Sequence, residues 1–337
     1  MVVPCRNEAA HIVGLLDALA EQTRTPDEII IVNDASADAT VDVVRTWQSA
    51  HAAQKVLLVE GPGRGPAAAM NAGIRATDAD VIMRMDGHSI PARDYLERCL
   101  ETLGGVGEVR RSSGGAKADG AGGVGVVGGV WDVRPGADTA VARAIAAVVS
   151  HPLGSGGAGY RAVNASGPER VSVETVPFGT FPRAVWEQVG GFDESLAVNE
   201  DFDFNYRARR AGYDVVLDRR ITATYFARPT LGALSGQYFR YGFWKMQMLR
   251  KDPRALHPRQ LPPTMVLPWI VGTIMAVSFW PGVLTVGLVS LYPLIVLAGG
   301  LAVGGSRSVN PIAAALATAS VHLSWSAGFW RGTLRRK

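Results

Sequence analysis

The feature that most limits how this chain can fold is a run of 40 residues, 264–303, that contains no Asp, Glu, Lys, Arg or His. A helix crosses the hydrocarbon core of a bilayer with about 20 apolar residues, so the run predicts two membrane-spanning helices, broken near Trp280-Pro281-Gly282. A third candidate span, 309–330, has His322 as its one ionisable side chain. The composition agrees, because 47% of the 337 residues are hydrophobic and 19% are charged. We therefore predict a membrane region over 264–330 with three spans.

Basic residues flank this apolar region, and the net charge of the chain is +4. They are Arg240, Lys245, Arg250, Lys251, Arg254 and Arg259 before the run, and Arg331, Arg335, Arg336 and Lys337 in the tail. Such placement is typical of membrane flanks, so we expect membrane lipids and no nucleic acid as partners. Three spans would put the tail on the far side from the rest of the chain, against the tendency of basic residues to stay cytosolic. Either one candidate is re-entrant or the tendency does not hold here.

Upstream of the membrane region, short β-branched runs alternate with helical patterns, which predicts a parallel sheet covered by helices. The expected strands are 1–4, 28–33, 55–59 and 81–85, and the expected helices between them are 11–20, 38–49 and 66–77. A second half continues with a strand at 124–133 and helices near 138–150 and 199–211. Between the halves, the Gly-, Ser- and Ala-rich segment 104–123 is expected to be a flexible loop. These elements predict an α/β domain over 1–230.

The cysteines help to place this domain. Cys5 and Cys99 form no spaced set typical of disulfides or zinc sites. This suits a reducing compartment, so we expect the α/β domain to face the cytosol. Together with the predicted spans, the expected location is the cell membrane, as a multi-pass protein. The chain begins inside the first expected strand, with no signal peptide before it, so we expect the printed start to lack a few residues.

One acidic motif follows the apolar strand that ends near Met85. Asp86 and His88 are both competent ligands of a divalent ion, and their spacing puts them on one side of an extended strand end. The carboxyl ends of strands are where open α/β sheets bind ligands. Asp-Gly is also a common turn dipeptide, but its position directly after an apolar strand favours a site for Mg2+ or Mn2+ and a diphosphate.

A second acidic cluster begins the helix expected at 199–211. Acidic residues favour a helix N-terminus by themselves, so capping explains part of this pattern. Glu200, Asp201 and Asp203 exceed what capping needs, and the preceding turn at Gly190-Gly191 would present them at the edge of a cleft. Transfer of a sugar needs a carboxylate that deprotonates the attacking hydroxyl. Asp201 is our candidate for that base, with Glu200 as the fallback.

The segment 231–260 mixes aromatic and basic residues, as an interfacial amphipathic helix would. An ordinary packed helix can carry the same pattern. Within it, Gln237, Arg240 and Tyr241 could contact a phosphate or a sugar, although an arginine at a membrane surface is the simpler alternative.

Seven short motifs occur in order along residues 1–260. They are VPCRNE at 3–8, NDASADAT at 33–40, GPGRGPAAAMNAG at 61–73, RMDGH at 84–88, VPFGTF at 176–181, NEDFDFNYR at 199–207 and QYFRYG at 237–242. Each is weak alone, but the ordered set resembles glycosyltransferase family 2 with the GT-A fold. In particular it resembles the membrane-bound exopolysaccharide transferases of the succinoglycan type.

The resemblance implies roles for individual residues. Pro4 and Glu8 would frame the nucleotide pocket, and Asp34 would bind the uracil. Asp86 with His88 would hold the ribose, the diphosphate and Mg2+ or Mn2+.

Six further positions belong to the same resemblance. Arg64 and Asn71, in the third motif, would contact the donor, and Asp201 would be the base. Gln237, Arg240 and Tyr241 stand where processive members carry a Gln-x-x-Arg-Trp motif.

Two departures from the family pattern shape the expected reaction. The usual Asp-x-Asp is Asp86-Gly87-His88 here, which leaves the metal open, and Tyr241 replaces the Trp of processive members. We expect inverting transfer of one sugar from a UDP-sugar to a lipid-linked or glycan acceptor, for exopolysaccharide or cell-surface glycan synthesis. A processive synthase and an inactive membrane-tethered sugar-nucleotide-binding module are the alternatives. A dinucleotide oxidoreductase would need Gly-x-Gly-x-x-Gly after the first strand, where this chain has Pro-Cys-Arg-Asn-Glu.

Overall fold

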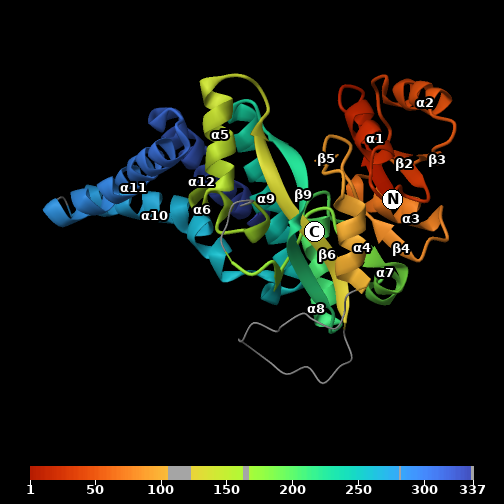
Figure 1. Cartoon of the computed structure of the whole chain (residues 1–337). Coiled ribbons are helices and arrows are strands. Elements are labelled where there is room, and N and C mark those ends of the chain that lie inside the picture. The colour runs from red at the N-terminus through yellow and green to blue at the C-terminus, as the bar shows by residue number, and fades with distance from the viewer. Residues whose placement is uncertain (105–122, 162–166, 281, 335–337) are drawn as a thin grey trace. The chain divides into compact units, whose positions relative to one another are not determined.

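The computed structural model describes residues 1–104, 123–161, 167–280 and 282–334. Apart from its two end residues, the predicted loop 104–123 lies outside the described residues, as do Arg335, Arg336 and Lys337 of the tail. The chain divides into two compact units (Figure 1). The first comprises Met1–Asp132 and Ala162–Tyr225, and the second comprises Val133–Arg161 and Phe226–Lys337. The boundary near 226 lies close to the predicted end of the catalytic domain at 230, but 133–161 groups with the C-terminal part.

The first unit begins with the predicted alternation of strands and helices. Strands β1 (Val2–Cys5), β2 (Ile29–Asn33) and β3 (Val56–Glu60) are parallel, in the order β1-β2-β3. Helices α1 (Ile12–Ala20), α2 (Thr40–Ala50) and α3 (Pro66–Arg75) follow them in turn. All five residues of β2 are buried, as expected for a parallel strand covered on both faces. The sequence prediction for this part is confirmed.

The rest of the unit forms a second, mixed sheet in the order β4-β8-β6-β9-β5, with β7 pairing β9. Its strands are β4 (Val81–Met83), β5 (Ile90–Pro91), β6 (Val124–Pro135), β7 (Arg170–Ser172), β8 (Thr180–Pro182) and β9 (Asp214–Ala227). Its helices are α4 (Tyr95–Gly104), α7 (Arg183–Val189) and α8 (Glu200–Arg210). A single parallel bridge between Val2 and Arg84 joins β1 to the end of β4.

The predicted parallel sheet is confirmed for β1, β2 and β3, but the fourth expected strand departs from it, since β4 pairs antiparallel with β8. Strand β8 has three residues, too few to show a period. Strand β9 carries charges that hide its pattern. One of them, Asp218, is fully buried and accepts hydrogen bonds from Arg220, Arg170 and Thr102. Such pairing is what allows a charge inside a sheet.

The second unit is helical within its described residues, apart from the strand ends that reach into it. Its helices are α5 (Ala140–Ser150), α6 (Pro152–Ser155), η1 (Gly159–Arg161), α9 (Leu231–Lys251), η2 (Pro253–Ala255), η3 (Pro258–Gln260), α10 (Leu261–Phe279), α11 (Val283–Arg307) and α12 (Pro311–Thr333). Three of them, α10, α11 and α12, are long and apolar enough to cross a membrane. The predicted break at 280–282 separates α10 from α11.

A carbonyl group inside α10 is satisfied by side chains of a neighbouring helix. Pro268 lies inside α10 and has no N–H to donate to the carbonyl of Thr264. That carbonyl instead accepts hydrogen bonds from Ser326 Oγ at 2.9 Å and Trp330 Nε1 at 2.8 Å, both on α12. In a lipid environment an unsatisfied carbonyl would be costly, so these bonds tie α10 to α12.

Helices α9 and α12 pack closely through glycines. A Cβ on Gly242 would lie 2.1 Å from the Trp325 carbonyl oxygen, and one on Gly328 would lie 2.0 Å from that of Phe239. Backbones can approach so closely only where side chains are absent. One face of α9 is therefore packed, as in an ordinary packed helix, while the side chains of Phe239 and Arg240 are exposed.

We predict that Gly328→Ala lowers the free energy of unfolding by about 1–3 kcal/mol, because the added methyl overpacks the contact between α9 and α12. Thermal unfolding in detergent micelles measures the change. Gly287→Ala on α11 is the matched control, since a Cβ there meets no atom within 4 Å. Alanine is the better helix former by about 1 kcal/mol, so the control should be neutral or stabilising. Equal midpoints for the two variants would contradict the close packing.

Candidate active site

The candidate site lies in the first unit, at the carboxyl ends of its strands. Directly after β2, Asp34 is buried, and its Oδ2 accepts a hydrogen bond from the Gly65 N–H at 2.7 Å. Its Oδ1 has no hydrogen-bond partner among the described residues. An unpaired buried acceptor is costly, so Asp34 suits a donor group of a ligand such as a nucleotide base. Pro4, in β1 beside Val32 of β2, is half-buried at the same edge.

The backbone around these strand ends is locally constrained. Asn7 follows β1 with φ 59°, and Ala35 follows β2 with φ 57°. Non-glycine residues reach this left-handed region at a cost that surrounding contacts must offset. Here the Asn7 side chain accepts from the Ala37 N–H at 2.8 Å, and the Asn7 N–H donates to Ser36 Oγ at 3.1 Å. The two loops therefore hold each other in place.

Glu8 of the first motif and His88 of the fourth motif come together. Glu8 Oε1 lies 2.9 Å from Nδ1 of His88. If the carboxylate accepts, Nδ1 carries the proton and the ring lone pair is on Nε2, as in metal-binding histidines whose other nitrogen donates to a carboxylate. Gly87 permits this approach, because a Cβ there would lie 2.9 Å from Cγ of Glu8.

Arg84 joins the two acidic clusters. Its Nε donates to Asp86 Oδ1 at 3.1 Å, and one terminal nitrogen lies 2.9 Å from Glu200 Oε1 at the start of α8. Arg84 and Glu200 are 8% and 5% exposed, so this ion pair is inside the protein. It links residues more than a hundred positions apart in the sequence and fixes α8 against the end of β4.

Burial and charge oppose each other in this group. Burial raises the pKa of Glu200 above its usual value; the Arg84 guanidinium lowers it, and the carboxylates of Asp201 and Asp86 raise it. Burial alone would lower the pKa of Arg84, but the nearby carboxylates outweigh it, so that the pKa of Arg84 is raised and the cation is held charged.

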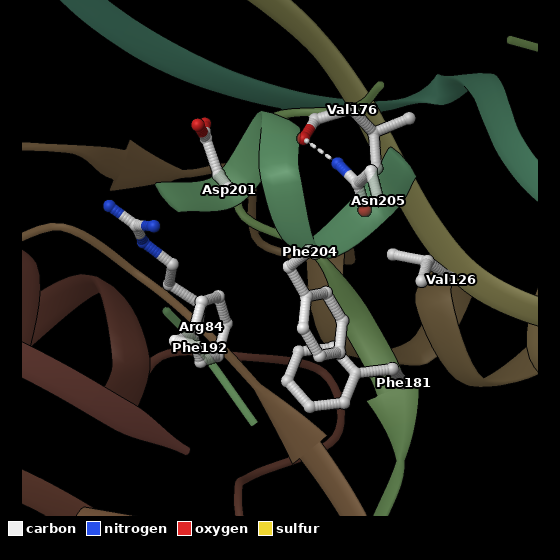
Figure 2. Close-up of a pocket in the computed structure, with 9 residues that line it drawn as sticks. Arg84, Val126, Val176, Phe181, Phe192, Asp201, Phe204 and Asn205 are labelled. Atoms are coloured by element: carbon white, nitrogen blue, oxygen red, sulfur yellow. Dashed lines mark hydrogen bonds between the residues drawn. The ribbon is translucent and has the colours of Figure 1, made fainter. Parts of the chain in front are cut away.

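Asp201 is placed differently from Glu200. It is half-exposed and lines a small pocket with Arg84, next to an apolar wall (Figure 2). The apolar wall consists of Val126, Val176, Gly179, Phe181, Phe192 and Phe204, and the polar side chain of Asn205 completes the lining. In Figure 2 the Asp201 carboxylate lies above the Arg84 guanidinium, whereas Asn205 is turned to the Val176 carbonyl, to which it donates at 3.2 Å. Of the two candidate bases, Asp201 is the one that borders the pocket.

The start of α8 explains this division of roles. Asn199 precedes the helix with φ 67°, and Glu200, Asp201 and Asp203 occupy its first turn. Consecutive helical residues point in different directions, so Glu200 faces inward while Asp201 faces the pocket. Asp203 is buried and pairs with Arg207 at 2.8 Å, a contact within the helix.

Asn71 and Arg64 take part in protein contacts. The Asn71 amide donates to the Phe192 carbonyl and to Glu194, and its oxygen accepts from Trp186 Nε1 and the Phe192 N–H. Asn71 thereby holds the turn 190–194. Its contact with the sugar donor stays a prediction, and its amide groups are all used in these protein contacts. Arg64 is exposed and pairs with Glu194 at 2.7 Å.

The three predicted binding residues of α9 belong to the second unit. Gln237 is buried, Tyr241 is half-buried with its ring 5.5 Å from that of Tyr238, and Arg240 is exposed. Their roles in binding stay predictions.

The predicted divalent ion would take only part of its ligands from the protein. Among the described residues, no three His, Cys, Asp or Glu side chains converge as a complete metal cage. Mg2+ usually binds through one or two carboxylates together with substrate phosphates and water. Asp86, which accepts from Arg84, and His88, whose Nδ1 lies beside Glu8, are the predicted partial set, and their binding of an ion stays a prediction.

Comparison with known proteins identifies the family. Residues 1–107 match the model of glycosyl transferase family 2. Over 99% of this chain and 94% of the relative, the sequence is 30% identical to succinoglycan biosynthesis protein ExoA of Rhizobium meliloti. The chain belongs to glycosyltransferase family 2. It is a glycosyltransferase of polysaccharide or glycan biosynthesis, as the motifs predicted.

Two further relatives extend this result. A dolichyl N-acetyl-alpha-D-glucosaminyl phosphate 3-beta-D-2,3-diacetamido-2,3-dideoxy-beta-D-glucuronosyltransferase of Methanococcus voltae is 24% identical over 74% of both chains. The structure of mannosyltransferase PcManGT from Pyrobaculum calidifontis, in complex with GDP-Man and Mn2+, superimposes with a TM-score of 0.67. It is 20% identical, and the match covers 100% of this chain and 87% of that one. The predicted GT-A fold is confirmed.

Arg84 is the site residue that the sequence analysis left without a role. A usable signal was present, because Arg84 and Asp86 are two positions apart on an extended segment and so share a side. Its second partner, Glu200, could not be inferred without the fold, since the pairing spans the two halves of the unit.

We predict that Arg84→Met lowers the stability of the protein by about 3–5 kcal/mol, because removal of one partner leaves a buried carboxylate uncompensated. Denaturant unfolding followed by tryptophan fluorescence measures it. Arg98→Met is the matched control, since Arg98 pairs with Asp94 on the surface, where an ion pair contributes at most about 1 kcal/mol. Adding Glu200→Gln to Arg84→Met should restore part of the loss. Equal losses for Arg84→Met and Arg98→Met would refute the bridging role.

Proposed function

We propose that the protein is a metal-dependent, inverting hexosyltransferase that moves one sugar from a UDP-sugar to a lipid-linked or glycan acceptor at the cytosolic face of the membrane. The product would serve exopolysaccharide or cell-surface glycan synthesis. One observation carries the proposal: Asp201 borders a pocket beside Arg84, which in turn pairs with Asp86 of the predicted diphosphate site. A base and a donor site in that arrangement are what sugar transfer requires.

The donor would occupy the strand ends. Asp34 offers its unpaired Oδ1 to an N–H of the base, and Pro4 and Glu8 border the same edge. Asp86 and His88 would hold Mg2+ or Mn2+ together with the diphosphate; when bound, such an ion supplies positive charge to the leaving group. The uracil preference rests on the motif resemblance.

In the proposed reaction Asp201 accepts the proton of the acceptor hydroxyl as its oxygen bonds to the anomeric carbon. The bond from that carbon to the phosphate oxygen breaks, and its electron pair leaves with the nucleotide diphosphate. Attack from the opposite face inverts the centre and gives a β-linkage from an α-linked donor. Glu200 stays paired with Arg84 and fixes the helix that carries the base.

The proposed organisation has three parts: a catalytic domain over 1–230, an amphipathic interfacial segment over 231–260 and a membrane region over 264–330. The three long apolar helices support the last part. The name of the Methanococcus relative describes a dolichyl-linked acceptor for that protein, which supports a lipid-borne acceptor here.

A transfer assay tests the function. Membranes that hold the full-length protein are incubated with radiolabelled UDP-sugars and with GDP-mannose, and label is followed into the lipid-extractable fraction. We expect transfer from one UDP-sugar. Transfer from GDP-mannose alone would overturn the nucleotide assignment, and transfer from none would overturn the function.

In this assay Asp201→Asn should reduce turnover by about 10²- to 10⁴-fold, because the amide cannot accept the proton. UDP binding, measured by calorimetry, should stay near normal. Glu200→Gln should reduce turnover far less, when turnover is expressed per folded protein. Asp203→Asn serves as a matched carboxylate control on the same helix. If Asp201→Asn turns over like the native protein, Asp201 is not the base.

Metal dependence gives a second test. Chelator should abolish transfer, because the leaving diphosphate then lacks a counter-ion. Added Mn2+ or Mg2+ should restore transfer. His88→Ala should need a higher metal concentration for half-maximal activity, whereas His51→Ala, remote in sequence and stacked on Trp47, should not. Full activity in excess chelator would end the metal assignment.

A further inference from the structure

The two ends of the apolar region meet in the second unit. In the first turns of α10, the Thr264 carbonyl accepts hydrogen bonds from Ser326 and Trp330 of α12, at 2.9 and 2.8 Å. The Leu267 N–H donates to Ser326 Oγ at 3.1 Å. The start of α10 and the last turns of α12 therefore lie at the same end of the helical unit.

The basic end of α9 joins the same place. Gln247 Nε2 donates to the Gly332 carbonyl at 2.9 Å, and an Arg250 terminal nitrogen donates to that of Thr333 at 2.6 Å. Helices α9 and α12 thus run parallel along a shared contact and end together.

This arrangement limits how many helices can cross the bilayer. Three consecutive crossings would put the start of α10 and the end of α12 on opposite faces, about 30 Å apart. Hydrogen bonds of 2.8 and 2.9 Å between them exclude that separation. An even number of the three helices must therefore cross.

Charge decides which two helices cross. The connection between α10 and α11, 280–282, has no charged residue, whereas Arg307 ends α11 and Arg331 lies in the last turn of α12. Arg250 and Lys251 precede α10. Basic residues stay on the cytosolic side, so a hairpin of α10 and α11 inserted from that side satisfies every one of them.

Burial points the same way. In its most apolar stretch, 44% of α12 is buried inside the protein, against 11% for α10 and 22% for α11. Figure 1 shows α10 and α11 projecting as a pair from the second unit, while α12 lies beside α9, with which it is in contact. A helix that already packs on several neighbours has less surface to give to lipid.

The contact at the middle of α12 also fits a position outside the hydrocarbon. His322 lies with Nε2 2.8 Å from the Leu153 carbonyl of α6, a one-turn helix followed by Gly156 and Gly157 with positive φ. Irregular backbone of this kind is not tolerated where it faces lipid tails. The large hydrophobic side chains that are exposed on α12 and directly after it lie on one side of the helix, as in a helix along the interface; they are Ile312, Leu316, Trp330 and Leu334.

We propose that α10 and α11 cross the membrane as a two-span hairpin and that α12 lies along the lipid–water interface on the cytosolic side. The exposed side of α12 contacts lipid, and both the start of α10 and the end of α12 face the cytosol. The proposal rests on the membrane location given under the proposed function, but not on the transfer reaction.

Cysteine labelling tests it in the full-length protein. Gly282→Cys marks the α10–α11 turn, Gly305→Cys the end of α11 and Leu334→Cys the end of α12; the two glycines have no atom within 4 Å of an added Cβ, and Leu334 is 71% exposed. A membrane-impermeant maleimide is applied to inside-out and to right-side-out vesicles. The native chain is the control, because Cys5 and Cys99 are buried, and detergent-opened vesicles report total accessibility.

We expect Gly305→Cys and Leu334→Cys to react in inside-out vesicles and Gly282→Cys in right-side-out vesicles. Gly282→Cys and Leu334→Cys reacting in right-side-out vesicles, with Gly305→Cys reacting in inside-out vesicles, would mean three crossings and overturn the proposal. Gly282→Cys and Leu334→Cys on the cytosolic face with Gly305→Cys outside would mean that α11 and α12 cross. All three on the cytosolic face would mean that none of the helices crosses. Both results also overturn the proposal. If the native chain transfers no sugar in the assay described above while the labelling is as expected, the proposed function is rejected and this topology stands.

Discussion

The ion pair between Arg84 and Glu200 is the contact on which the candidate site depends. It connects the end of β4 to the first turn of α8, and the same guanidinium reaches Asp86. Because Arg84 and Glu200 are buried, removal of either one would leave the charge of the other unpaired inside the protein, which is costly. The Arg84 cation therefore holds Asp86, of the predicted diphosphate site, and the start of the helix that carries the proposed base in one geometry.

This arrangement separates two neighbouring carboxylates by environment. Glu200 is buried, and its pKa is raised by desolvation and restrained by Arg84. Asp201, one residue later, borders the pocket. The helix places them on different sides, so that Glu200 pairs inside the protein and Asp201, the proposed base, borders the pocket. Such a division of roles between adjacent acids is a common route to a positioned base.

The second unit solves a different problem, that of polar groups among apolar helices. Pro268 releases the Thr264 carbonyl, and Ser326 and Trp330 of α12 satisfy it. Glycines at 242 and 328 let α9 and α12 approach to backbone contact. The same contacts bring the start and the end of the apolar region together, and on this the proposed two-span hairpin rests.

The sequence by itself determined what depends on local pattern: the parallel β1-β2-β3 arrangement, the charge-free run with its break at 280–282, and the motifs that predicted family and fold. Periodicity and composition act within a few residues, so they are visible without a structure. The sequence did not predict strands β8 and β9. Strand β8 is too short to show a period, and β9 buries charges that its partners neutralise. The pairing of Arg84 with Glu200, the placement of Asp201 rather than Glu200 at the pocket, and the meeting of α10 with the end of α12 were decided by tertiary structure alone. Each joins residues far apart in the chain, and only the packed fold sets the distance between them.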